Sequence, residues 1–128
     1  MPSELSLAVV GAQHPNLRGP TRQFAIALCK PGDPVELRRE PKNPADPHAV
    51  AVFNREGMQM GYLTAERAPW IGGMIGRGRE MIAIFQSSTE HGAAIRLAFD
   101  GAVPVLPIMR DRPSADPDFW PDEEWPEY

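Results

Sequence analysis

The chain has 128 residues, a length that fits one domain with a core of its own. Its single cysteine, Cys29, excludes an internal disulfide and a multi-cysteine zinc site. No apolar run approaches the ~20 residues that span a bilayer, and the N-terminal stretch lacks the basic region of a signal peptide. These features predict a soluble, cytoplasmic protein without a membrane partner.

Charge is divided unevenly along the chain. Residues 1–110 contain 12 Lys and Arg against 10 Asp and Glu, whereas residues 111–128 contain one Arg against seven acids. The formal net charge of −4 therefore originates in the C-terminal segment and does not argue against a polyanionic partner for the rest. A balance of +2 is nevertheless too small for nucleic-acid binding by charge alone. We expect a domain over residues 1–110, followed by an acidic tail over residues 111–128.

Four prolines in the acidic tail oppose a helix, and its like charges resist collapse. The tail also contains the aromatic residues Phe119, Trp120, Trp125 and Tyr128. Two interpretations stay open. Either the tail is disordered or packs on this protein's own surface, or it is a linear motif that binds a partner.

Short apolar or alternating runs, bounded by turn-forming residues, predict a series of β-strands. The predicted strands cover Leu5–Val10, Arg22–Cys29, Val35–Glu40, His48–Phe53, Met58–Leu63, Arg79–Gln86 and Ala93–Asp100. Between two of them, Asn54–Gly57 has the composition of a hairpin turn. Residues 103–109 are predicted as an edge strand, because the prolines in this segment cannot donate to a central ladder.

One helix is predicted between the strands. Thr64 is suited to cap its start, and Pro69 fits the first turn, where the amide that proline lacks is not needed. The helix is expected to end near Gly76 or Gly78. Its buried stripe is predicted to consist of Trp70, Ile71, Met74 and Ile75. Strands and helix together predict a mainly β fold, a small and partly open antiparallel β-barrel with one short helix.

Motifs of common enzyme classes do not occur in the sequence. It contains no P-loop, no H-E-x-x-H zinc motif and no G-x-S-x-G nucleophile motif. His14, His48 and His91 have no partner at a metal-ligand spacing. The glycines of residues 72–78 indicate the end of a helix rather than a phosphate cradle. We therefore expect a protein that is not an enzyme, with no cofactor and no bound metal.

A stiff polar connection, PKNPADPH at Pro41–His48, joins two predicted strands. Its three prolines restrict the backbone, and Asn43 and Asp46 can bond to nearby amides, so the loop should hold one shape. With its flanking strands, this loop resembles the HIRAN domain. The residues that carry the resemblance are Val9, Val10 and Gly11; Arg39, Glu40, Pro41, Asn43, Pro44, Asp46, Ala49, Val50 and Val52; and Gly61, Tyr62 and Leu63. The resemblance extends over roughly Leu5–Asp100 and leaves the acidic tail outside.

The resemblance implies an OB-like β-barrel. HIRAN domains occur in Swi/Snf-type DNA-dependent ATPases and as free-standing bacterial proteins, and the best understood members recognise the 3′ end of single-stranded DNA. By that likeness, Asp46 would accept a hydrogen bond from the terminal 3′-hydroxyl. A carboxylate repels phosphate, so Asp46 would select a strand end over a continuous strand.

Two departures from the family pattern concern base stacking. Ala45 stands where the family often has an aromatic residue, and the first loop has His14 where tyrosines are frequent. The candidate nucleic-acid contacts are His14, Arg18, Arg22, Lys42, Asn43, Asp46, Tyr62 and Arg67. Simpler roles remain open for two of them, since Tyr62 can belong to the core and Asp46 can bond amides of its own loop.

These observations predict a nucleic-acid-binding module that recognises 3′ ends of single-stranded DNA in DNA repair or processing, with RNA as an open alternative ligand. A second hypothesis is a protein-interaction module. In that case the barrel or its acidic tail docks onto a separately encoded DNA-processing ATPase, helicase or nuclease.

Overall fold

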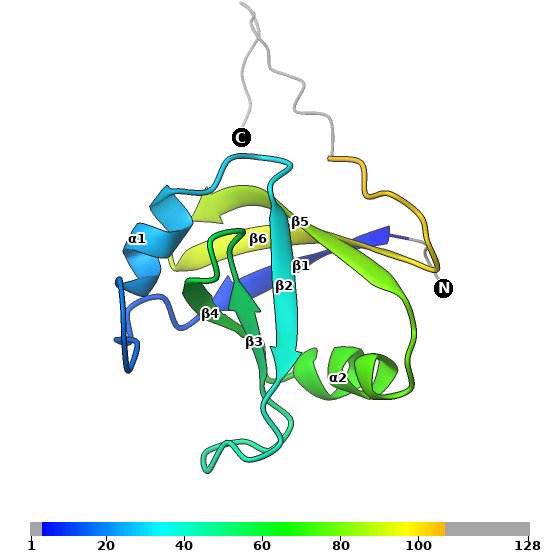
Figure 1. The fold of residues 1–128 in the computed structure, drawn as a ribbon, viewed down its shortest axis with the longest axis horizontal. Helices are drawn as coiled ribbons and strands as arrows, with labels where there is room; N and C mark the ends of the chain where they lie inside the picture. Colours follow the sequence, from blue (N-terminus) through cyan, green and yellow to red (C-terminus); the bar gives the residue numbers. More distant parts are fainter. Residues whose placement is uncertain (1–3, 107–128) are drawn as a thin grey trace, which may run out of the picture.

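The structure, a computed structural model, describes residues 4–106. Its elements, in chain order, are β1 (Glu4–Val10), α1 (Arg22–Ala27), β2 (Pro34–Arg39), β3 (Val50–Phe53), β4 (Gln59–Leu63), α2 (Ala68–Gly76), β5 (Met81–Thr89) and β6 (Gly92–Phe99). The strands form a closed barrel in the order β1-β4-β3-β2-β5-β6, and each neighbouring pair is antiparallel (Figure 1). The prediction of a mainly β, OB-like antiparallel barrel is confirmed.

The barrel is closed rather than partly open, because its first and last strands pair with each other. The register of β1 with β6 runs from Glu4 opposite Ala98 to Val9 opposite Ala93. β1 also pairs with β4 at its other edge, through Val9 opposite Leu63. Each edge of β1 is therefore occupied, and the end of this strand is fixed where the first long loop begins.

The prediction of a strand over residues 22–29 is wrong, because Arg22–Ala27 forms α1. Thr21 caps this helix, and its Oγ1 accepts a hydrogen bond from the Phe24 amide at 3.1 Å. The buried residues of α1 are Arg22, Ala25 and Ile26, a helical spacing, while Phe24 is 49% exposed. The run fits a strand pattern because its large side chains, Phe24, Ile26 and Leu28, alternate with alanines, but the helix leaves Phe24 and Leu28 partly exposed.

The predicted helix is confirmed as α2, although it begins at Ala68 rather than directly after Thr64. The Thr64 Oγ1 accepts only a long 3.4 Å hydrogen bond from the Arg67 amide, within a turn that precedes the helix. Pro69 lies in the first turn as expected, and Gly78 adopts a φ of +81° just beyond the end. The described residues thus contain two helices instead of one.

The predicted edge strand at 103–109 is not formed over residues 103–106, and its remainder lies outside the described residues. A hydrogen bond holds this segment to the start of β1, since the Val105 amide donates to Glu4 Oε1 at 3.0 Å. The acidic tail and its aromatic residues also lie outside the described part of the chain.

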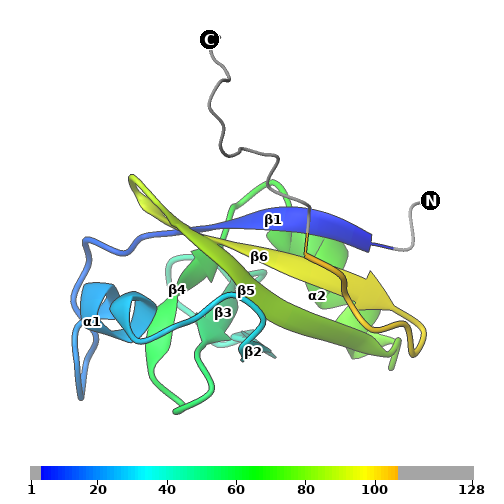
Figure 2. The same ribbon diagram turned by 90° about the horizontal axis from the view of Figure 1, so that it is seen from above.

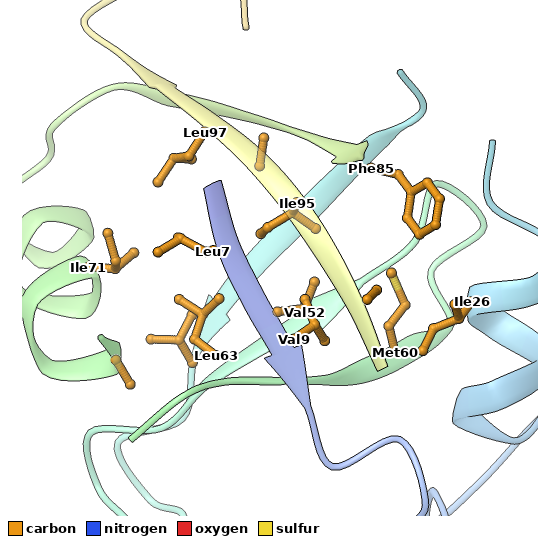
Figure 3. Packing of buried hydrophobic residues seen from close by; sticks show 14 of the residues in the cluster. Leu7, Val9, Ile26, Val52, Met60, Leu63, Ile71, Phe85, Ile95 and Leu97 are labelled. Atoms are coloured by element: carbon orange, nitrogen blue, oxygen red, sulfur yellow. The ribbon is translucent and has the colours of Figure 1, made fainter. Parts of the chain in front are cut away.

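Side chains from the strands and from both helices fill the barrel interior. Met60, Val52 and Ile95 are fully buried at its centre. Ile71 of α2 and Ile26 of α1 enter this core from opposite sides (Figure 3). The two helices therefore lie at different ends of the barrel, as the turned view also shows (Figure 2). Trp70 is half-buried against the same core.

Close backbone contacts with β1 explain two glycines in neighbouring strands. A Cβ added to Gly61 of β4 would overlap the Val10 carbonyl oxygen, and one added to Gly92 of β6 would overlap that of Val9. Gly61 also has a φ of +152°. Neither backbone oxygen can move away cheaply, because both belong to a strand that is paired on each side.

We predict that Gly61→Ala destabilises the domain by at least ~2 kcal/mol, because the added methyl must displace a paired strand. The melting temperature should fall by roughly 10 °C, measured by circular dichroism. Gly73→Ala is the matched control. It places the same methyl on α2, where the Arg77 side chain is 3.3 Å away, and should leave stability equal or slightly higher. Equal melting temperatures for the two variants would contradict this account.

We also predict that the acidic tail adds little to the stability of the barrel. A chain that ends at Arg110 should melt within about 5 °C of the full chain, since ~1 kcal/mol corresponds to a shift of 4–8 °C in a domain of this size. A larger drop in thermal denaturation would show that the tail is part of the folded unit.

Candidate nucleic-acid interface

A groove of about 770 Å³ lies on the outside of the barrel, between three segments far apart in sequence. The loop over residues 15–20 forms one wall, the start of the loop over residues 40–44 forms another, and β3, β4 and their connecting turn form the floor. In Figure 1 the loop after β2 projects below the barrel, and the loop before α1 lies to its left. The polar, charged and aromatic side chains that line the groove include Arg18, Arg22, Glu40, Asn43, Gln59 and Tyr62.

The Glu40 carboxylate connects the floor of the groove to the stiff loop. Its Oε1 accepts hydrogen bonds from the Tyr62 hydroxyl at 2.8 Å and from Asn43 Nδ2 at 2.9 Å. Tyr62 is half-buried on β4 and does not belong to the buried core. Its position is thus set by a hydrogen bond across the barrel wall, and its side chain lines the groove.

Arg22 fixes the opposite wall. It is only 8% exposed, and its Nε and Nη1 donate to Asn16 Oδ1 at 2.8 Å and to the Gly11 carbonyl at 2.9 Å. The guanidinium carbon also lies 5.3 Å from the centre of the Tyr62 ring. Asn16 in turn donates to the Gln59 carbonyl at 3.2 Å. The loop before α1 is therefore hydrogen-bonded both to the helix and to the floor.

The loop over residues 41–48 is held by its own side chains. Asn43 Oδ1 accepts from the amides of Ala45 at 2.8 Å and Asp46 at 3.2 Å, and Asp46 Oδ1 accepts from the His48 amide at 2.8 Å. The Glu40 amide donates to the Ala49 carbonyl and closes the base of the loop. Asp46 thus bonds to an amide of its own loop, one of the two roles considered for it from the sequence. Within residues 4–106, this bond engages only one of its carboxylate oxygens.

The structure places the eight predicted contact residues in two sets. Arg18, Arg22, Asn43 and Tyr62 line the groove. The others, His14, Lys42, Asp46 and Arg67, do not line it. Lys42 and Asp46 belong to the bordering loop, His14 is exposed near Gly11, and Arg67 lies over the Trp70 ring at 5.6 Å.

Glu40, Gln59 and Phe53 line the groove although they are not among the predicted nucleic-acid contacts. Glu40 belongs to the loop motif, whereas no role was predicted for Gln59 or Phe53. Arg38 lies 4.0 Å from the centre of the Phe53 ring and adds a cation beside the floor. The alternation of Phe53 with its neighbours placed it on a strand, but nothing in the sequence indicated that the outer face of that strand is hollowed.

The fold and the groove define a small β-barrel binding domain. Two solved structures share its fold. The HIRAN domain of human HLTF has 21% identity and a TM-score of 0.62 over 76% of this chain and 74% of that one. A protein from Lactobacillus plantarum has 18% identity and a TM-score of 0.56 over 74% of this chain and 98% of that one.

The HIRAN domain family model matches residues 4–100, and the chain therefore belongs to the HIRAN family, a class of nucleic-acid-binding modules. No curated protein matches the chain. Within the described residues, neither helix is long and apolar enough to cross a membrane, and no three His, Cys, Asp or Glu side chains gather into a possible metal site.

Tyr62 should make stability depend on pH in alkaline solution. Burial of the phenol raises the pKa of Tyr62, and the Glu40 carboxylate also raises it, against the opposing effects of Gln59 and Arg22. Because the folded pKa exceeds the unfolded value of about 10, ionisation costs more in the folded state. The stabilising contribution is present below pH 10 and is lost as the pH rises towards the folded pKa.

We therefore predict that the free energy of unfolding falls less steeply above pH 10 in Tyr62→Phe than in the parent chain, as measured by urea denaturation. Both chains should carry Cys29→Ala, because burial chiefly raises the pKa of Cys29 to about 11 and the thiol would otherwise contribute in the same direction. Parallel curves for the two chains would contradict a neutral, carboxylate-bonded Tyr62.

Proposed function

We propose that the groove binds single-stranded nucleic acid, and that the loop over residues 41–48 recognises a free 3′ end of DNA. The observation that carries the proposal is the hydrogen-bonded connection from Tyr62 through Glu40 to Asn43. It holds an aromatic side chain on the floor of the groove and a polar loop in one of its walls in fixed positions. A site that orders its groups before binding loses less entropy when the ligand arrives.

The chemistry of the groove suits a short single strand. The Tyr62 ring offers a stacking surface for a base, a contact that contributes ~1–3 kcal/mol in single-strand binders. Arg18 lines the opposite wall, where a guanidinium can meet a backbone phosphate. Ala45 adds no ring, and the Phe53 ring is already in contact with the Arg38 guanidinium. We therefore assign base stacking to Tyr62, with one nucleotide held at the groove.

Asp46 is assigned to the 3′-hydroxyl. Its Oδ1 bonds to the His48 amide, and Oδ2 has no hydrogen-bond partner among residues 4–106, so one acceptor can face a ligand. A hydroxyl can donate to this oxygen, whereas a phosphate in its place would be repelled. This assignment supports a role in recognising DNA ends during repair or processing.

A second function is favoured by a specific surface on α1. Phe24 and Leu28 lie one turn apart and are 49% and 44% exposed. Two large apolar side chains on one helical face suit a protein partner, such as a separately encoded DNA-processing ATPase, helicase or nuclease. Fluorescence anisotropy with labelled single-stranded oligonucleotides at low salt separates the two functions. Absence of binding would remove the nucleic-acid proposal and leave the protein-interaction one.

We predict that Asp46→Ala removes the preference for a 3′-hydroxyl over a 3′-phosphate oligonucleotide. The wild-type chain should bind the hydroxyl form roughly 10- to 150-fold more tightly, the range of a charge-assisted hydrogen bond of ~1.5–3 kcal/mol. The variant should bind both forms equally, in anisotropy titrations at one salt concentration.

Asp46→Asn is the matched control, because its side-chain oxygen can still accept from the His48 amide while the charge is removed. It should keep the stability of the parent chain and lose most of the discrimination. Asp46→Ala should in addition lose ~1 kcal/mol of stability, as other capping groups do. Equal binding of the two oligonucleotides by the wild-type chain would refute the 3′-end pocket and leave Asp46 a structural role only.

A further inference from the structure

Three arginines lie beside α2, and none of them lines the groove. Arg39, the last residue of β2, lies against the helix where Gly72 and Gly76 have no side chain. A Cβ at Gly76 would be 2.7 Å from Arg39 Nη1. Arg77 Nη1 lies 3.3 Å from the corresponding position at Gly73. We call Arg39, Arg67 and Arg77, together with the Trp70 ring under Arg67, the arginine face.

The arginine face has no internal counter-charge. Within residues 4–106, none of its three guanidinium groups forms an ion pair or a hydrogen bond with an acid. Other arginines do, for example Arg38 with Glu36 and Arg96 with Glu4. The acids nearest in sequence are Glu40, which follows Arg39 and accepts hydrogen bonds from Tyr62 and Asn43, Glu66, in the turn before α2, and Glu80, just after it. Two of these cations flank one short helix and the third lies against it, so an anion that binds among them would reduce their mutual repulsion.

We propose that the acidic tail of the same chain binds to the arginine face. Residues 111–128 contain seven acids and one Arg, and the run Asp122–Glu124 is flanked by Trp120 and Trp125. Carboxylates complement the three guanidinium groups, and an indole ring can pack beside Trp70 and the glycines of α2. This binding is independent of the function proposed for the groove.

The chain between the barrel and the tail is long enough for this contact. The described chain ends at Leu106, next to Val105, whose amide donates to Glu4 Oε1 at the start of β1. Residues 107–120 span up to ~46 Å when extended, whereas a folded domain of this size has a radius of gyration of only ~13 Å. Because the tail is tethered, its effective concentration is of millimolar order, so weak ion pairs suffice.

The groove fits the acidic tail less well, although it also contains arginines. Glu40 places a carboxylate in its wall, and Arg22 already donates to Asn16 and Gly11. An acidic segment would meet repulsion there and would gain mainly Arg18. The charge distribution therefore directs the tail to α2 rather than to the groove.

The contact can be tested in the full chain by paramagnetic NMR. A nitroxide attached through Ser114→Cys, in a Cys29→Ala background, should broaden amide signals of Arg67–Gly78 more than those of the loop over residues 15–20. Arg67→Gln with Arg77→Gln should reduce the ratio of bound to unbound tail by roughly two- to thirtyfold, the effect of losing two exposed ion pairs. Higher salt should have the same effect in the parent chain.

Lys30→Gln with Arg55→Gln is the matched control, since it removes the same charge elsewhere and should leave the broadening unchanged. Gly76→Ala, which keeps every charge and favours a helix, should weaken the contact by displacing Arg39. The proposal would be overturned if no broadening is seen, or if it is uniform or centred on the groove. It would also be overturned if Arg67→Gln with Arg77→Gln leaves the broadening unchanged. If that variant weakens oligonucleotide binding while no α2 signal is broadened, the arginine face binds nucleic acid and the proposal is wrong.

Discussion

The candidate interface depends on one carboxylate oxygen, Glu40 Oε1. It accepts hydrogen bonds from Tyr62 on β4 and from Asn43 in the loop over residues 41–48, so this strand and this loop are bonded to the same oxygen. A half-buried carboxylate stabilises such an arrangement only when its donors are present, and both donors here come from the chain itself. The groove therefore has a defined shape before any ligand binds, and the stiff loop cannot separate from the floor without breaking a charge-assisted hydrogen bond.

The closed barrel supports this arrangement because it leaves no strand edge free to shift. β1 pairs with β6 on one side and with β4 on the other, and glycines at the two contacts allow the backbones to approach closely. The helices add side chains to the core from opposite ends. The loops beside the groove consequently start from fixed strand ends, and their positions follow from the barrel rather than from their own length.

Much of the fold could be predicted from local sequence, because strand alternation and turn residues act over a few positions. The strand predicted from Arg22 to Cys29 was wrong. The apolar alternation of this run suits a strand as well as a helix, and the Thr21 cap and the exposure of Phe24 favour the helix. The loop motif could be recognised from its residues. The bond from Tyr62 to Glu40 joins residues 22 positions apart, and the place of Gln59 in the groove depends on the barrel, so neither follows from local pattern.

The helix α1 has two faces that serve different surfaces. Arg22 on one face bonds to the loop that forms a groove wall, while Phe24 and Leu28 on another are exposed to solvent. Arg22 connects this six-residue helix directly to the loop that forms a groove wall. A displacement of α1 from the side of Phe24 would therefore also displace that wall.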